Sequence, residues 1–118
     1  MYNGGMVTQR SGKLSPRDNR IVKRLKLRLQ EITPINRVVV FGSRARGDAS
    51  PDSDLDVFIE IPELNAALRR KISEIAWEVS LDEEILISTF VATTAAILDS
   101  PFGANPILRT ITTEGIVV

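Results

Sequence analysis

The chain contains no cysteine and no histidine among its 118 residues. The absence of cysteine excludes a disulfide framework, a thiolate nucleophile and a zinc site with thiolate ligands. The absence of histidine excludes the Ser-His-Asp triad, an imidazole general base and metal sites with imidazole ligands. Any metal ion that binds this chain must therefore have oxygen ligands, which Mg²⁺, Mn²⁺ and Ca²⁺ prefer.

Aromatic residues are also few, with four Phe, one Tyr and one Trp. Most of them lie in apolar segments and do not form a row of stacking side chains, so we do not expect nucleic acid as a ligand. No apolar run approaches the ~20 residues of a membrane span. The first 13 residues lack the apolar segment of a signal peptide. We therefore expect a cytoplasmic protein with no membrane segment.

The length and the ordinary content of 43% hydrophobic and 25% charged residues indicate one domain. We expect residues 1–14, which are rich in glycine and polar residues, to be a disordered tail, and residues 15–118 to fold. The formal net charge is zero but unevenly distributed. Residues 1–46 carry eleven basic and two acidic residues, and residues 47–118 carry four basic and thirteen acidic residues. This asymmetry indicates either a site where anions and cations meet or two halves that neutralise each other on folding.

Hydrophobic periodicity predicts an α/β protein of the α+β type: a small mixed sheet of three to four strands flanked by helices. Arg17, Arg20, Arg24 and Arg28 recur at helical spacing, and we favour a solvated helix face over a ligand surface. Trp77 is expected to be partly buried. The predicted helices cover residues 16–31, 62–79, 93–98 and 106–114, and the predicted strands cover 37–41, 55–61 and 84–90.

The segment between the first two predicted strands carries the pattern that points to chemistry. Gly42 and Ser43 follow a buried strand directly, and ten residues later Asp54 and Asp56 stand two apart. A glycine at this point lets a phosphate approach the backbone, and the Ser43 hydroxyl and neighbouring amides can bind it. Residues two apart on a strand share one face, so the two carboxylates repel each other unless a cation neutralises them.

A purely local explanation of this segment is a turn, because Gly, Ser, Asp and Pro gather in loops. We prefer the functional interpretation because Asp56 lies between Leu55 and Val57 in an otherwise apolar run, where a carboxylate needs a partner. The spacing of Gly42 and Gly47 also matches the beginning of a P-loop, but Asp48 and the following alanine stand where that motif requires Lys and Ser or Thr.

The string GSRARGDASPDSDLDVFIE resembles the signature of the minimal nucleotidyltransferase (MNT) family of the DNA polymerase beta superfamily. The resemblance is strong over residues 36–60 and looser over 62–118. It implies the nucleotidyltransferase fold, a triphosphate held by Gly42 and Ser43, and two Mg²⁺ ions, with Mn²⁺ as an alternative, bound by Asp54 and Asp56. It also implies phosphate contacts for Arg44 and Arg46, with loop solvation as an equal alternative for both arginines.

The family has a third carboxylate on the following strand. Glu84, which precedes the third apolar run, is our candidate for this metal-binding and catalytic position. Glutamate is one methylene longer than aspartate, which leaves two alternatives: the difference is harmless, or it displaces the carboxylate oxygen by ~1 Å, enough to cost ~100-fold in rate. A solvated strand start is a nearly equal interpretation of Glu84.

Within that superfamily the chain is similar to the stand-alone minimal type, because it has no room for an acceptor-binding domain. The resemblance implies Mg²⁺-dependent transfer of a nucleoside monophosphate, AMP from ATP, to an acceptor hydroxyl. It also implies a HEPN-type helical partner protein, with an antitoxin role for this chain. The alternative is a non-catalytic nucleotide-binding or interaction module that neutralises a partner by covering it. Homo-oligomerisation remains open.

Overall fold

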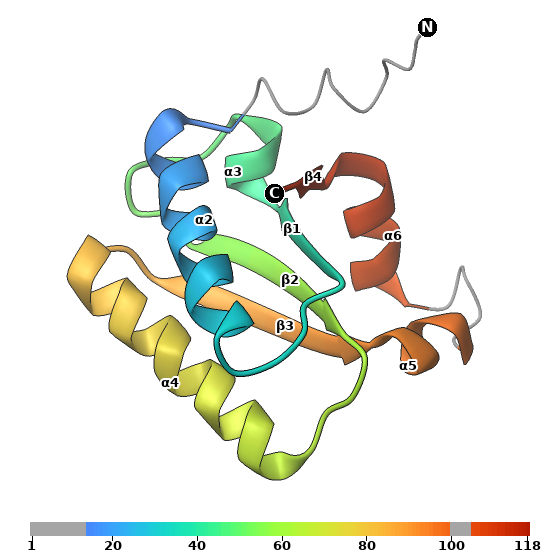
Figure 1. The fold of residues 1–118 in the computed structure, drawn as a ribbon. Helices are drawn as coiled ribbons and strands as arrows, with labels where there is room; N and C mark the ends of the chain where they lie inside the picture. The colour runs from blue at the N-terminus through green and yellow to red at the C-terminus, as the bar shows by residue number, and fades with distance from the viewer. Residues whose placement is uncertain (1–13, 100–104) are drawn as a thin grey trace, which may run out of the picture.

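The computed structural model describes residues 14–99 and 105–118, which form a four-stranded sheet with helices on both faces (Figure 1). The sheet order is β3-β2-β1-β4, so β3 and β4 lie at the edges. Strand β2, Leu55–Ile61, pairs antiparallel with β1, Arg37–Phe41, and parallel with β3, Ile87–Thr93. The predicted fold class is therefore confirmed. The predicted disordered tail falls, apart from Leu14, outside the described residues.

The first described helix is α2, Pro16–Gln30, and it begins where the sequence predicts. Ser15 is its N-cap and accepts a hydrogen bond from the Asp18 amide at 3.0 Å, while proline occupies the first helical position, where no amide donor is needed. Its apolar stripe is fully buried, with Ile21, Val22, Leu25 and Leu29 inaccessible to solvent. None of the described helices is both long enough and apolar enough to cross a membrane.

Helix α4, Ala66–Glu83, begins four residues later than expected. We expect Pro62 to begin this helix, but Asn65 is its N-cap and accepts a hydrogen bond from the Leu68 amide at 2.8 Å. An asparagine side chain satisfies a free amide at a helix start, which a proline ring cannot do. The third strand was also placed too early, because residues 84–86 form the connection from α4 to β3.

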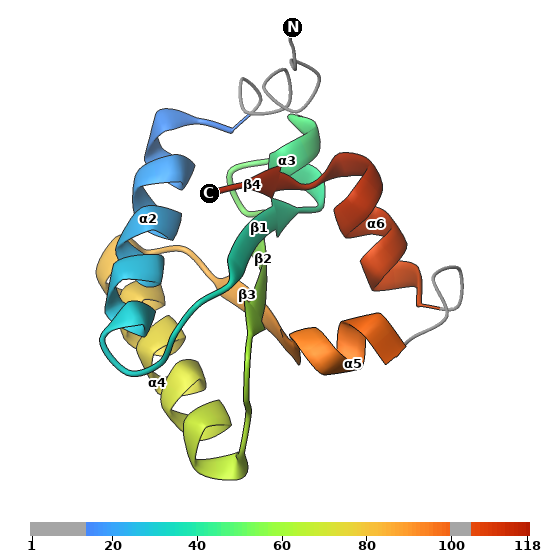
Figure 2. The same cartoon turned by 45° about the vertical axis from the view of Figure 1, so that its right-hand side comes forward.

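The two faces of the sheet carry separate clusters of buried side chains. Helices α2 and α4 cover one face (Figure 2), and the larger cluster lies between them and the sheet. Helix α6, Pro106–Glu114, covers the other face with the help of α5, Thr94–Asp99. There Val39, Phe41, Phe58 and Ile111 form the smaller cluster. Side chains alternate along β2, so Asp56 shares the face of Phe58, on the side of α6. The last strand is β4, Ile116–Val117.

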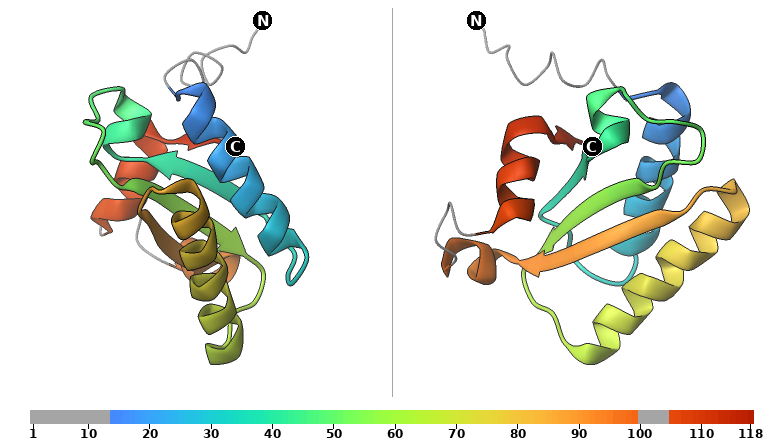
Figure 3. Two further views of the ribbon diagram at one scale, coloured as in Figure 1. Left: turned by 90° about the vertical axis from the view of Figure 1, so that its left-hand side faces the viewer. Right: turned by 180° about the vertical axis from the view of Figure 1, so that it is seen from behind.

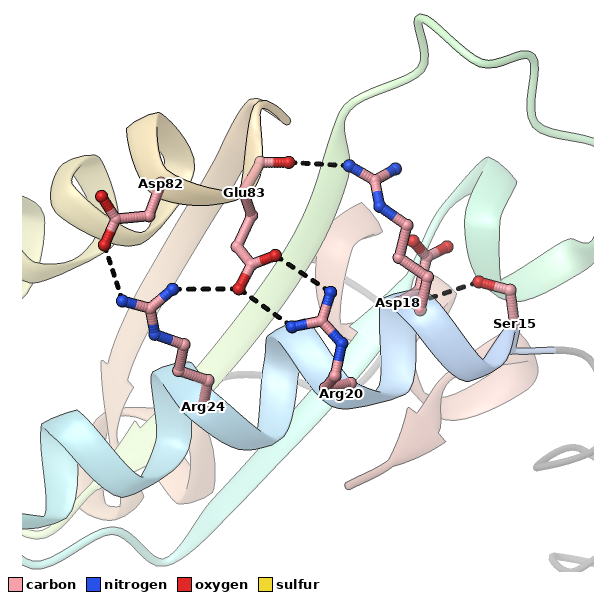
Figure 4. Close-up of polar contacts among 7 residues, drawn as sticks. Ser15, Asp18, Arg20, Arg24, Asp82 and Glu83 are labelled. Atoms are coloured by element: carbon pink, nitrogen blue, oxygen red, sulfur yellow. Dashed lines mark hydrogen bonds and ion pairs between the residues drawn. The ribbon is translucent and has the colours of Figure 1, made fainter.

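The arginine stripe of α2 lies against the C-terminal part of α4 and pairs with its acidic residues (Figure 4). The Glu83 carboxylate accepts hydrogen bonds from both terminal guanidinium nitrogens of Arg20, each at 3.0 Å. It also accepts one from Arg24 at 2.9 Å, and Arg24 donates another to Asp82 at 2.6 Å. Arg28 pairs with Glu78 further along the two helices. Three arginines of the basic half thus pair with three acidic residues of the other half between these helices. Arg17 and Arg20 are exposed, as expected of a solvated face, whereas Arg24 and Arg28 are half-buried in the interhelical contact.

Candidate functional site

The glycine-serine corner lies at the end of β1. After Phe41 the chain turns at Gly42, which has φ +80°, and continues into the single helical turn α3, Ser43–Arg46. Within residues 14–99 and 105–118, no group accepts a hydrogen bond from the amide or the hydroxyl of Ser43. Both groups are therefore free to donate to a ligand, and their role as phosphate donors stays a prediction. A left-handed Gly47 closes the turn.

Asp56 faces this corner directly. It lies opposite Phe41 in the antiparallel register of β1 and β2. A Cβ atom built on Gly42 would overlap Oδ2 of Asp56, so the aspartate occupies the space that any side chain at position 42 would need. Only glycine fits both the positive φ and this close approach. The predicted association of the Gly-Ser corner with the second aspartate is present in the structure.

The charge of Asp54 acts on the Asp56 carboxyl. Partial burial raises the pKa of the Asp56 carboxyl, and the negative charge of Asp54 raises it further. The Arg46 guanidinium opposes these effects and lowers the pKa. Asp54 is exposed, and its Oδ2 accepts a hydrogen bond from the Ser88 hydroxyl of β3 at 3.4 Å. The corner therefore holds two carboxylates whose repulsion a cation would relieve.

A third carboxylate does not join this pair in the described part of the chain, where no group of three or more acidic side chains is close enough to hold a metal ion. Glu84 is the C-cap of α4, with a left-handed φ of +56°, and its amide donates to the carbonyl of Ser80. It lies beside Trp77 and Leu81 around a surface hollow. The expectation that Glu84 completes the site is therefore wrong, because the residue ends a helix instead of starting a strand.

In the register of the sheet, Asp56 lies opposite Ser88 on β3. A serine thus stands nearest the aspartate pair on the strand where we sought the third carboxylate. The strand begins only at Ile87, three residues later than expected, and this shift places Ser88 opposite Asp56.

Arg44 does not face the corner. Its guanidinium donates to both carboxylate oxygens of Asp18 at 3.2 Å and to the carbonyl oxygens of Ser53 and Pro51 at 2.9 and 3.2 Å. The Arg44 and Asp18 side chains are 9% and 5% exposed. Through these bonds the Arg44 guanidinium connects α2 to the loop that precedes Asp54. Arg44 thus has a structural role here instead of the phosphate contact that we expected.

Arg46 does lie near the aspartates, as its effect on the pKa of Asp56 shows. It donates to Glu114 Oε2 at 2.9 Å and to Asp48 Oδ2 at 3.2 Å. The same Glu114 oxygen accepts the Gly42 amide at 3.2 Å. The last residue of α6 thus holds the corner through the Gly42 amide and the Arg46 guanidinium. Sequence reasoning missed this residue, because its place beside Gly42 depends on how α6 packs.

The sequence of the chain matches the model of the nucleotidyltransferase domain over residues 22–100, two thirds of its length. The chain belongs to this nucleotidyltransferase domain family. It is 43% identical over 58 residues to a protein of Methanocaldococcus jannaschii that bears the name of a protein adenylyltransferase. The match covers 48% of this chain and 59% of that relative, so the chain spans somewhat more than half of the relative's length.

Two solved structures share the fold of this nucleotidyltransferase domain. A variant of the toxin–antitoxin complex MntA–HpeT aligns with a TM-score of 0.57 and 18% identity, and covers 86% of this chain and 70% of the other. A toxin–antitoxin structure with AMP-PNP aligns with a TM-score of 0.56 and 18% identity, and covers 85% and 70%. At this identity the likeness shows the fold.

Proposed function

We propose that this chain transfers AMP from ATP to a hydroxyl group of a partner protein. The observation that carries the proposal is the arrangement of Asp54 and Asp56 at the Gly42-Ser43 corner, where Asp56 contacts the glycine and its pKa is raised. The name of the archaeal relative supports adenylyl transfer to protein. The toxin–antitoxin neighbours, one of them with AMP-PNP, support a nucleotide and a protein partner. We propose a HEPN-type toxin as this partner.

The residues of the corner fit the handling of a triphosphate. The Ser43 amide and hydroxyl are free to donate to phosphate oxygens, and the glycine before it leaves room for the Asp56 carboxylate beside this corner. Arg46 adds a positive charge at the same edge. In the reaction the acceptor oxygen attacks the α-phosphorus, the bond from this phosphorus to the pyrophosphate oxygen breaks, and the acceptor proton leaves to solvent or a base. The chain contributes position and charge to this displacement.

The aspartate pair fits a divalent cation. Mg²⁺ typically binds to one or two carboxylates together with substrate phosphates, and Asp54 and Asp56 supply two carboxylates that repel each other. Mg²⁺ bound by Asp54 and Asp56 would neutralise the carboxylates and the phosphate oxygens of the nucleotide. We propose Mg²⁺ for this site, with Mn²⁺ as a substitute. Two carboxylates support at least one ion of the pair that the family resemblance implies.

The test uses α-labelled ATP, Mg²⁺ and the product of the gene adjoining the one that encodes this chain. We expect label on that protein, and loss of labelling in Asp54→Asn, in Asp56→Asn and when a chelator replaces Mg²⁺. Asp52→Asn is the matched control, because Asp52 is an exposed aspartate of the same loop outside the pair. Labelling that persists in both site variants would refute the proposed site.

The alternative function is a module that binds and covers its partner without chemistry. One observation favours it: Glu84 does not join the aspartates, so the site lacks the third carboxylate that the family resemblance implies. If this alternative holds, the adjoining gene product is neutralised equally well by the wild type and by the Asp54→Asn/Asp56→Asn double variant. Loss of neutralisation in the double variant, with binding intact, would favour the enzyme.

A further inference from the structure

Three large apolar side chains remain exposed where α4 ends and the connection to β3 begins. Trp77, Leu81 and Leu86 are 57%, 60% and 51% exposed. Trp77 and Leu81 are four residues apart and therefore share one face of α4. Together with Ser80, Glu84 and Ile85 they line a hollow of about 320 Å³. We refer to Trp77, Leu81 and Leu86 as the apolar patch.

The apolar patch adjoins the candidate site. The carbonyl of Leu86 accepts the amide of Leu55 at 2.9 Å, and Asp54 directly precedes Leu55. Neighbouring strands are about 4.8 Å apart, so Leu86 and Asp54 lie on adjacent segments at the same end of the sheet. The right-hand view of Figure 3 shows this end, where α4 runs into β3 beside the start of β2. A molecule seated on the patch therefore lies at the end of the sheet that holds Asp54, on the side of α4.

Three acidic side chains lie around the patch, and Arg17 is near its edge, where it donates to the carbonyl of Glu83 at 2.7 Å. Glu74 precedes Trp77 by one helical turn, Glu84 lines the hollow, and Asp54 lies beyond Leu86. None of the three pairs with a basic side chain of residues 14–99 or 105–118, in contrast to Glu78, which pairs with Arg28. A second copy of this chain on the patch would bring two such acidic rims together, which costs free energy. The charges instead favour an occupant with basic residues around an apolar centre.

We propose that the apolar patch is the docking surface for the acceptor protein, which presents an apolar side chain to the hollow and lysine or arginine to the acidic rim. This proposal rests on the proposed function, since it concerns the protein that would supply the acceptor hydroxyl. Tryptophan is enriched among interface residues whose truncation costs most, and an exposed tryptophan beside two leucines is rare on a surface that contacts only water. Docking beside Asp54 places the acceptor near the nucleotide before any chemistry occurs.

Trp77 is the only tryptophan of the chain, so its fluorescence reports on the patch directly. The experiment adds the adjoining gene product, in a tryptophan-free form, to the full chain without nucleotide. We expect Trp77 to be quenched by acrylamide in the free chain and protected in the complex. Protection in the free chain that is independent of concentration means that the chain covers its own patch. Protection that grows with the concentration of this chain alone means self-association. Either result overturns the proposal.

Substitutions then test the apolar centre by calorimetric titration. Trp77→Ala and Leu81→Ala should each weaken binding by about tenfold or more. Leu27→Ala is the matched control, because Leu27 is 66% exposed but lies on α2. Thermal unfolding of each variant separates loss of binding from loss of folding. Equal affinities for Leu81→Ala and Leu27→Ala in folded proteins, or no binding of the gene product to the wild type, would overturn the proposal.

The acidic rim is tested by Glu84→Lys, which reverses a charge at the hollow and keeps a non-glycine residue at the same φ. Association should slow several-fold, and its dependence on salt should weaken. The Asp56→Asn variant, which leaves the acidic rim intact, separates the two proposals. If the docking surface is right and the enzymatic function wrong, wild type and Asp56→Asn bind alike and neither labels the partner. If only the docking surface is wrong, labelling persists in Trp77→Ala.

Discussion

Arg44 and Asp18 form an ion pair, with both carboxylate oxygens 3.2 Å from one guanidinium nitrogen, and the two side chains are almost completely enclosed. The pair connects the first turn of α2 to the loop that leads to Asp54, because the same guanidinium also holds the carbonyl oxygens of Pro51 and Ser53. The position of the first aspartate of the site thus depends on a contact between residues 26 positions apart.

Removing one partner of this pair should be costly. Asp18→Asn leaves the Arg44 charge enclosed without a counter-ion, and we expect a loss of about 3 kcal/mol in the free energy of unfolding, measured with urea. Replacing both side chains, as Asp18→Leu with Arg44→Met, removes the uncompensated charge and should recover most of this loss. An unchanged urea midpoint for Asp18→Asn would show that the pair contributes little.

Gly42→Ala should damage both stability and transfer. The new methyl group meets the Asp56 carboxylate and the backbone is strained at φ +80°, so we expect at least about 2 kcal/mol of destabilisation and at least about 100-fold slower labelling. Gly47→Ala is the control, since its φ is +87° but nothing lies within 4 Å of the added atom. It should show only the backbone cost of about 1–2 kcal/mol and retain labelling. Equal behaviour of the two variants would contradict the close approach of Asp56.

Glu84→Gly should stabilise the protein and leave transfer unchanged. A left-handed conformation costs an L-residue about 1–2 kcal/mol, and the greater chain entropy of glycine takes back about 0.5–1 kcal/mol. We therefore expect a net gain of about 0.5–1 kcal/mol in urea unfolding. The labelling rate should equal that of the wild type when the partner is saturating. A large loss of labelling rate at a saturating partner concentration would indicate that Glu84 takes part in catalysis.

The contact of Glu83 with two arginines predicts a pH-dependent contribution to stability. Hydrogen bonds from Arg20, then from Arg24, hold the pKa of the Glu83 carboxyl below its ordinary value. The folded state therefore binds this proton less readily than the unfolded state, so the contribution is complete above the ordinary glutamate pKa of about 4.3 and is lost as the pH falls through the lowered value.

The measurement compares Glu83→Gln with the wild type across this pH range by urea unfolding. The variant should be less stable at pH 7, and the difference should shrink as the solution becomes more acidic. Glu74→Gln, an exposed position of the same helix, serves as the control and should track the wild type throughout. A difference between Glu83→Gln and the wild type that is constant with pH would contradict this linkage.

Local sequence patterns determined the elements that build the corner. Three short-range patterns predict them: the β-branched run ending at Phe41, the Gly-Ser turn, and the two-residue spacing of Asp54 and Asp56. The strand, the turn and the shared face of the two aspartates follow from backbone geometry alone. The same holds for the caps at Ser15 and at Asn105.

Which other side chains meet at the corner was decided only by tertiary packing. Glu84 and Ser88 lie in one segment, and a boundary shift of three residues places the serine, not the glutamate, beside the aspartates. Asp18 and Glu114 come from opposite ends of the described chain, and they reach Arg44 and Gly42 because α2 and α6 pack on opposite faces of the sheet. Contacts at such separation depend on register and helix packing, which no local pattern encodes.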